Sequence, residues 1–281
     1  MSVPTKIVGP DGQAAFVDEL GQVFTRPVDF HHEVSNGTVL GHRVVQKFGR
    51  ATVGTTFVPV AFGGAWQTPL VSSATALRVA AGNVNDAQGG TGARSIILQG
   101  IATNGQEVTS AILTNGTSPG AASAQEFCRL YRAFVEDSGT YATVSPLAAS
   151  QAGDITIENA AGGTTWAVID STNFARSQTE IACYTVPANE RALIPTISVT
   201  VDATKSTDIL FFQRQNIIKT TAPFPAMRLV NAAIGISGPV QFQPEAPVGG
   251  FPPLTDFIFL AKVAQSTGAV IVNFEILLEA A

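Results

Sequence analysis

The chain has 281 residues, a net charge of −5 and only 13% charged residues, about half the share of an average soluble domain. Its apolar content of 45% excludes a disordered chain. The lack of any apolar run of about 18–20 residues excludes a membrane-spanning helix, and the acidic balance argues against a nucleic-acid surface. So little charge indicates a protein that covers much of its surface in an assembly.

Residues 1–55 differ from the rest of the chain. They contain all three histidines, His31, His32 and His42, together with balanced charges, turn signals and only short apolar runs. We interpret them as an extended N-terminal arm that pairs with a neighbouring subunit, with a small β-element as the alternative. Asp29–Glu33 (DFHHE) is the densest group of metal-ligand types. Because neighbouring side chains of a strand point to opposite faces, we predict no metal site there.

From residue 56 onward the sequence consists of short strand candidates and turns. The clearest hairpin pairs residues 95–102 with 107–113 across Asn104 and Gly105. Asn-Gly is the preferred pair of a type I′ turn, so a tight two-stranded ribbon is predicted here.

Further strand candidates are short and end at Gly, Pro or polar residues. They are 55–62, 77–82, 126–137, 153–159, 164–170, 181–187, 192–202, 208–215, 227–237, 256–264 and 269–279. Residues 126–137 are long enough for a helix, but their aromatic and β-branched residues favour a strand. Residues 153–159 and 164–170 are expected to form a second hairpin. Residues 192–202 alternate apolar and polar side chains, as a half-buried strand does.

These patterns predict an all-β fold of antiparallel β-sandwich or jelly-roll domains with an extended N-terminal arm. We expect an arm at 1–55, a β-sandwich domain at 56–180 and a second, jelly-roll-like β-sandwich at 181–281. One continuous sandwich with exchanged strands is the alternative.

No catalytic or cofactor-binding constellation is predicted. No histidine follows His42, so a Ser-His-Asp or Cys-His arrangement would have to use the arm. The glycine-rich stretch 83–94 lacks the phosphate-loop motif and leads into a strand. The neighbouring acids Glu136 and Asp137 are interpreted as a solvated turn rather than a glycosidase pair. We therefore predict a protein without enzymatic activity, cofactor or metal.

Two pairs of residues leave alternatives open. Cys128 and Cys183 lie in apolar, strand-like contexts and are interpreted as buried thiols, with a disulfide as the alternative. Trp66 and Trp166 could stack on a sugar ring in a carbohydrate-binding module if they are exposed beside acids.

Arginine supplies eleven of the sixteen basic residues. Its planar guanidinium is favoured where bidentate contacts cross an interface, with ordinary surface salt bridges as the alternative. The interface candidates are Arg129, Arg132, Arg176, Arg191 and Arg214.

The order of several motifs resembles a family of tailed-bacteriophage virion structural proteins. The run from residue 41 reads GHRVVQKFGRATVGTTFVPVAFGGAWQTP, and residues 90–120 read GTGARSIILQGIATNGQEVTSAILTNGTSPG. FCRLYRAFVEDSGT, AGDITIENAAGG and CYTVPANERALI follow in that order. The resemblance covers residues 41–200, and the C-terminal hundred residues are similar in style. It implies a component of marine or cyanobacterial phage virions and brings no catalytic motif.

Together these observations predict a non-enzymatic virion protein, a capsid decoration or cement protein that acts through inter-subunit contacts. The expected partners are further copies of the chain, in a trimer or other symmetric oligomer, and the major capsid protein or other virion proteins, without direct contact to nucleic acid or membrane. The alternatives are a tail or neck adaptor, a baseplate or fibre-anchoring protein, a carbohydrate-binding receptor-recognition module and a small major capsid protein of jelly-roll type.

Overall fold

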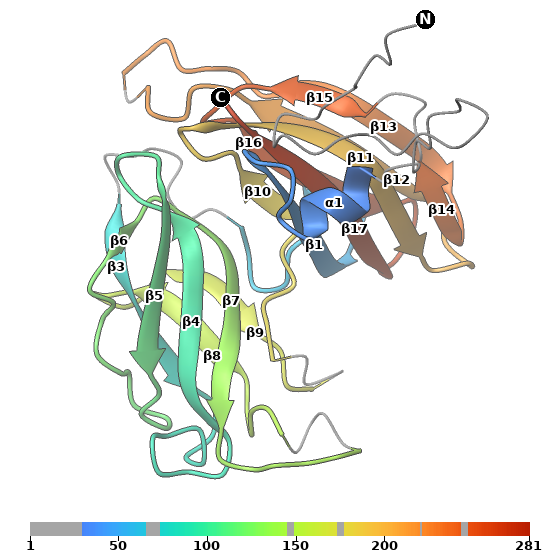
Figure 1. Cartoon of the computed structure of the whole chain (residues 1–281). Helices are drawn as coiled ribbons and strands as arrows, with labels where there is room; N and C mark the ends of the chain where they lie inside the picture. The colour runs from blue at the N-terminus through green and yellow to red at the C-terminus, as the bar shows by residue number, and fades with distance from the viewer. Residues whose placement is uncertain (1–29, 66–73, 145–148, 173–176, 220, 243–246) are drawn as a thin grey trace, which may run out of the picture. The chain divides into compact units, whose positions relative to one another are not determined.

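The structure, a computed structural model, describes residues 30–65, 74–144, 149–172, 177–219, 221–242 and 247–281. The chain divides into two compact units, residues 1–42 and residues 43–281. The second unit is built from strands, and every strand pair with a defined register is antiparallel (Figure 1). The predicted all-β antiparallel fold is therefore confirmed.

The first unit contains a short helix, α1 (Phe30–Ser35), within the segment expected to be extended. The helix closes with a hydrogen bond from the Asn36 N–H to the His32 carbonyl at 3.0 Å, and it buries Val34. The edge of the Phe30 ring packs against His42, with 5.6 Å between the ring centroids. Residues 1–29, which make up most of the predicted arm, lie outside the described residues.

Two β-sandwiches make up the second unit. The N-terminal sandwich consists of β3 (Thr75–Ala81), β4 (Ala93–Ile101), β5 (Glu107–Leu113), β6 (Glu126–Phe127), β7 (Arg129–Ser138), β8 (Ile155–Asn159) and β9 (Thr165–Ile169). Its two sheets have the strand orders β6-β3-β8-β9 and β5-β4-β7. Both sheets contribute to one hydrophobic core, in which strand side chains alternate between inside and outside.

The C-terminal sandwich combines strands from both ends of this unit. They are β1 (His42–Val53), β2 (Val58–Pro59), β10 (Cys183–Thr185), β11 (Glu190–Val201), β12 (Thr207–Arg214), β13 (Arg228–Ile236), β14 (Pro239–Phe242), β15 (Val248–Phe251), β16 (Asp256–Val263) and β17 (Gly268–Ala280). One sheet has the order β1-β17-β11-β14, with β15 also on β11, and the other has the order β10-β16-β12-β13, with β2 also on β16.

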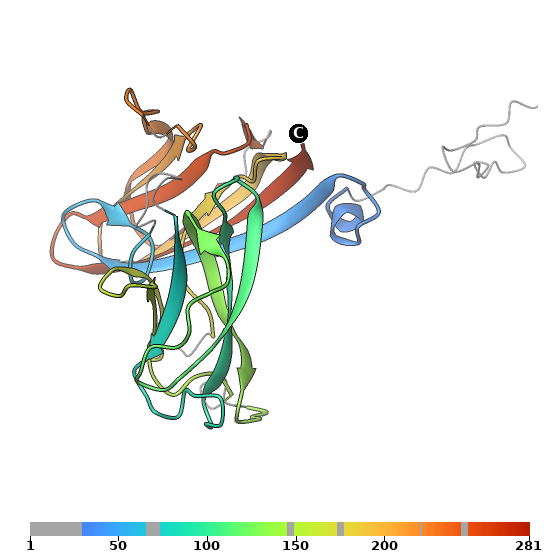
Figure 2. The same ribbon diagram turned by 90° about the vertical axis from the view of Figure 1, so that its left-hand side faces the viewer.

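Residues that the sequence analysis placed in the arm thus take part in the C-terminal sandwich. β1 lies beside β17 along its sheet (Figure 2). Near its middle, Gly49 approaches Ala182 so closely that a Cβ atom at position 49 would lie 2.1 Å from the Ala182 nitrogen. Only glycine permits this approach of two backbones.

Both predicted hairpins are confirmed by strand pairing, but the turn type of the first is different. β4 pairs with β5, and β8 pairs with β9. In the first hairpin Gly105 has a φ of +78°, whereas Asn104 is not among the residues with positive φ. A type I′ turn requires positive φ at both central residues. Instead, the Gly105 N–H donates to the Ala102 carbonyl and the Asn104 side chain accepts the Gln106 N–H. This is a turn with a single left-handed glycine.

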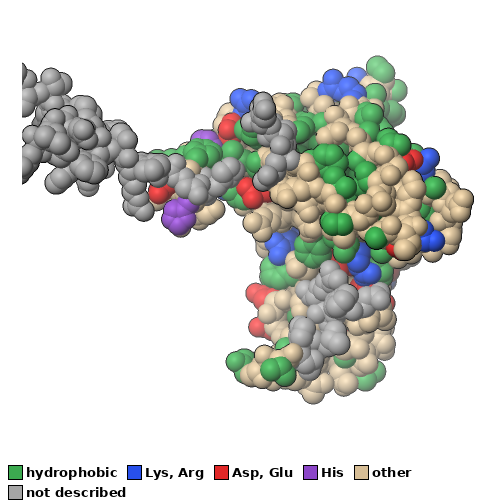
Figure 3. Space-filling view, turned by 90° about the vertical axis from the view of Figure 1, so that its right-hand side faces the viewer, with side chains coloured by type: hydrophobic (Ala, Val, Ile, Leu, Met, Phe, Trp, Pro, Cys, Tyr) green, Lys and Arg blue, Asp and Glu red, His purple; other side chains and the backbone are tan. Residues whose placement is uncertain are grey.

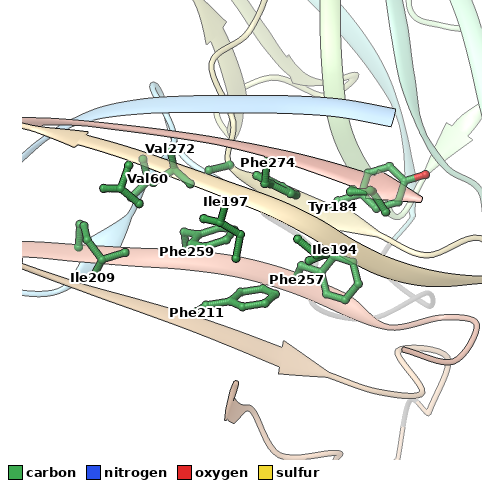
Figure 4. Packing of buried hydrophobic residues seen from close by; sticks show 14 of the residues in the cluster. Val60, Tyr184, Ile194, Ile197, Ile209, Phe211, Phe257, Phe259, Val272 and Phe274 are labelled. Atoms are coloured by element: carbon green, nitrogen blue, oxygen red, sulfur yellow. The ribbon is translucent and has the colours of Figure 1, made fainter. Parts of the chain in front are cut away.

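The core of the C-terminal sandwich is rich in aromatic side chains (Figure 4). Phe211 stacks on Phe259 with 4.6 Å between ring centroids, and Phe251 and Phe257 are equally close in a T-shaped arrangement. Each fully buried large apolar side chain stabilises the fold by about 1.5–3 kcal/mol. The predicted alternation in 192–202 is confirmed, because Ile197, Val199 and Val201 all face this core.

Strand β16 belongs to both hydrophobic cores. Phe257 and Phe259 point into the C-terminal core, while Ile258 and Leu260 pack in the core of the N-terminal sandwich. A strand covered on both faces reads as a continuous apolar run, which explains the sequence FIFLA. The sheet that contains β16 thus joins the two sandwiches.

Candidate functional site

A buried arginine–aspartate pair links the two sandwiches. Arg129, at the start of β7, is 1% exposed. Its Nη2 donates to Oδ2 of Asp256 on β16 at 2.9 Å, and its Nη1 donates to the Cys128 carbonyl at 2.7 Å. The Thr185 hydroxyl donates to the same carboxylate at 2.7 Å. Arg129 was predicted as an interface residue on the protein surface, and this is wrong. Its guanidinium is used inside the chain, where a buried charge requires a partner.

Two arginines of β1 make further ion pairs within the unit. Arg50 binds Asp170 through Nη2 and Glu180 through Nε, the latter at 2.6 Å, and both carboxylates are buried. Arg43 binds both carboxylate oxygens of Glu190, at 2.7 and 2.6 Å, and its Nη2 also lies 2.8 Å from Glu107. The hydrogen bond to Glu190 raises the pKa of Arg43, which therefore stays protonated.

A polar groove of about 480 Å³ lies where strands β1, β7, β11 and β17 meet. We use this name for the hollow lined by Gln46, Lys47, Phe48, Arg132, Gln178, Thr179, Thr196, Ser198, Asn273, Phe274 and Glu275. The residues come from β1, β7, the segment before β10, β11 and β17. No single stretch of the sequence carries the groove, so sequence analysis gave no signal for it.

Four side chains of the polar groove form no hydrogen bond with any other described residue: Gln46, Thr196, Ser198 and Asn273. The two strands of the sheet place Ser198 directly opposite Asn273. Each of the four groups can both donate and accept hydrogen bonds. The groove therefore presents an array of available polar groups on one sheet face.

Lys47 lines the polar groove from a buried position. Its Nζ donates a hydrogen bond to the Tyr131 carbonyl and lies 5.6 Å from the centroid of the Tyr131 ring. Burial is the main cause that lowers the pKa of Lys47 to about 7; Cys183 opposes this shift, and the positive charge of Arg132 adds a smaller lowering effect. A lysine in this position is unusual, because few charged side chains are fully buried.

The second feature is a sheet edge that exposes apolar side chains. β13 ends its sheet and pairs only with β12 among the described strands. Leu229 is 54% exposed and Ile234 is 64% exposed on this strand, and Phe224 and Met227 are exposed just before it. Hydrophobic side chains also reach the surface of the C-terminal sandwich in Figure 3. We call Phe224, Met227, Leu229 and Ile234 the β13 edge.

The remaining interface candidates lie in different places. Arg132 stacks over Phe134, 5.4 Å from its centroid, and donates to the Gln178 side chain at 2.9 Å. Arg191 is exposed, with its Nε 3.7 Å from Glu279. Arg214 is half-buried on β12. The last candidate, Arg176, lies outside the described residues.

The tryptophans and cysteines that the sequence analysis considered for binding or reactivity are buried wherever the structure describes them. Trp166 is 2% exposed and cannot stack on a sugar, and Trp66 lies outside the described residues. Cys128 and Cys183 are both buried, as predicted. Within the described ranges, no cluster of three or more His, Cys, Asp and Glu side chains could hold a metal ion. In the same ranges no helix is long and apolar enough to cross a membrane.

The glycine-rich stretch 83–94 is organised by a buried carboxylate. Asp86 accepts backbone hydrogen bonds from Ala93 and Ala152 at 2.8 Å and from Gly153 at 2.9 Å. The three donors satisfy a charge that would otherwise be costly to bury. These hydrogen bonds tie the loop to the neighbouring strand β4 and to residues 152–153.

Comparisons with known proteins identify no family for this chain. No protein family model and no curated protein matches it. Among solved structures, that of infectious bursal disease virus Gt strain aligns with a TM-score of 0.20 and 7% identity, over 92% of this chain and 78% of that chain. The crystal structure of the infectious bursal disease virus VP2 subviral particle gives a TM-score of 0.18 and 10% identity, over 90% and 82%. Both likenesses are weak.

Proposed function

We propose that this chain is a non-enzymatic structural protein of a phage virion, a decoration (cement) protein that stabilises the head through contacts between subunits. The β13 edge is the observation that carries the proposal. A freely diffusing monomer seldom leaves a row of large apolar side chains on an unpaired sheet edge. The motif order in residues 41–200 and the low charge of the chain support the same conclusion.

The proposed occupant of the β13 edge is a second copy of the chain, in a symmetric homo-oligomer. The edge supplies two kinds of interaction. β13 pairs only with β12 among the described strands, so its outer side offers backbone donors and acceptors, while Leu229 and Ile234 offer apolar area. In the shell of the phage head, the proposed partner is the major capsid protein. Such a protein stabilises by the area that it buries and catalyses no reaction.

The test replaces Leu229 and Ile234 by lysine together and measures the mass of the purified protein by light scattering after size exclusion. The wild type is expected to form an oligomer, and the variant a folded monomer that no longer joins virus particles. The matched control replaces Val84 and Leu113, two exposed apolar residues of the N-terminal sandwich, by lysine and should leave the oligomer intact. A monomeric wild type, or a variant that still assembles, would contradict the proposal.

A further inference from the structure

The polar groove has the size and the position of a ligand site. Its volume of about 480 Å³ falls within the range of about 300–1,000 Å³ that is common for small-molecule sites. It lies where β7 and residues 178–179 meet the sheet of β1, β17 and β11. Junctions of this kind are a preferred location for binding sites.

The available polar groups of the groove are arranged by strand geometry. Ser198 lies opposite Asn273, and Thr196 lies opposite Glu275, two positions further along the same two strands. Neighbouring strands are about 4.8 Å apart, and residues i and i+2 of a strand are about 6.6 Å apart. Ser198, Asn273 and Thr196 can each donate and accept hydrogen bonds, and they therefore stand with the acceptor Glu275 at regular intervals on one face. Sugar hydroxyl groups have this same double capacity.

The charges of the groove favour an uncharged ligand. Arg132 and Glu275 contribute opposite charges to the lining, and the buried Lys47 already donates to the Tyr131 carbonyl. A site for a phosphate or another polyanion would instead show an excess of positive charge. Half-buried Phe48 adds an apolar surface against which the C–H face of a sugar ring can pack.

One wall of the groove is already ordered without a ligand. The Arg132 guanidinium is held between the Phe134 ring and the Gln178 side chain. Little conformational entropy is lost when such a group meets a ligand. From the volume, the available hydrogen-bonding groups and the presence of both signs of charge in the lining, we propose that the polar groove binds a neutral saccharide. This site is separate from the β13 edge and does not depend on the proposed function in the virion.

The test is a glycan array probed with the purified full chain. The array carries neutral oligosaccharides that end in glucose, galactose, mannose or N-acetylglucosamine, and also sialylated and phosphorylated ones. The neutral glycan with the strongest signal is then titrated by calorimetry against the wild type and against Ser198→Ala/Asn273→Ala. We expect the double variant to bind at least about tenfold more weakly, which corresponds to the loss of hydrogen bonds worth about 1.4 kcal/mol.

The control variant is Thr200→Ala, because Thr200 is an exposed residue of β11 that does not line the groove. It should bind like the wild type, and equal thermal midpoints should show that all variants are folded. Absence of neutral glycan binding would overturn the proposal, as would equal affinity in the double variant. Binding of only sialylated or phosphorylated glycans would overturn the assignment to a neutral ligand. None of these results bears on the oligomer test.

Discussion

Replacing Lys47 by methionine should stabilise the protein at neutral pH. Burial lowers the pKa of Lys47 from 10.5 to about 7, and each unit of this shift corresponds to about 1.4 kcal/mol. Keeping the protonated lysine in the fold therefore costs about 5 kcal/mol at pH 7 and below. Methionine has a similar length and no charge, but the Tyr131 carbonyl loses its donor, at about 1–3 kcal/mol. The expected net gain is about 2–4 kcal/mol.

Because of Lys47, the stability of the wild type should also change with pH. Between pH 7 and 10.5 the unfolded chain holds a proton on Lys47 that the folded chain has released, so this residue makes stability rise with pH. Below pH 7 both states are protonated, and the contribution of Lys47 no longer varies. Lys47→Met should remove the rise, and its advantage over the wild type should shrink as the pH approaches 10.5.

Denaturation by urea at several pH values between 6 and 10 measures both effects. Lys262→Met is the control, because Lys262 lies near the surface, 3.4 Å from Asp208. It should change stability by less than about 1 kcal/mol and keep the wild-type slope, since Lys47 is still present. A Lys47→Met variant that is less stable than the wild type at pH 7, with an unchanged slope, would refute the reasoning.

Three further predictions concern buried polar groups. Asp86→Ala should destabilise the protein by about 3 kcal/mol or more, because three backbone donors lose their acceptor. Asp86→Asn should lose less stability in urea denaturation. Equal losses in the two variants would count against the role of the carboxylate charge. Arg129→Met should cost about 3–5 kcal/mol because it leaves the Asp256 carboxylate buried without its guanidinium, and adding Asp256→Leu should recover most of this; a further loss in the double variant would contradict the pairing. Burial raises the pKa of Cys128 to about 11 and also raises that of Cys183, so neither thiol should react with a thiol reagent at pH 8 until the protein unfolds, and rapid labelling of the native protein would contradict their burial.

Local signals in the sequence identified both hairpins and most strands, but they missed β14 and β15 and placed β1 in the N-terminal arm. Alternation of apolar and polar residues identified 192–202, and the Asn-Gly pair identified the first hairpin. The turn type was not predictable from that pair alone. The connection from Ile101 to Glu107 contains additional residues, and a hydrogen bond to the Asn104 side chain stabilises a different turn.

The functional surfaces depend on contacts between distant residues, and composition does not encode these. A high share of arginine predicts interface contacts, but it does not identify the arginines that make them or the surfaces that they join. Arg129 bridges two sandwiches of one chain, and its partner Asp256 is 127 positions away. The polar groove gathers residues as far apart as Gln46 and Glu275. β13 was recognised as a strand, but its place at the end of a sheet follows only from the strand order.

The proposal that this chain is a phage decoration protein is tested most directly by its copy number in purified virus particles, relative to the major capsid protein. Quantitative mass spectrometry supplies this number. A decoration protein is expected at on the order of hundreds of copies per particle, in a fixed ratio to the symmetric shell. A count of about six or twelve copies would instead indicate a neck or tail component. Absence of the chain from the particles would contradict a structural role in the virion.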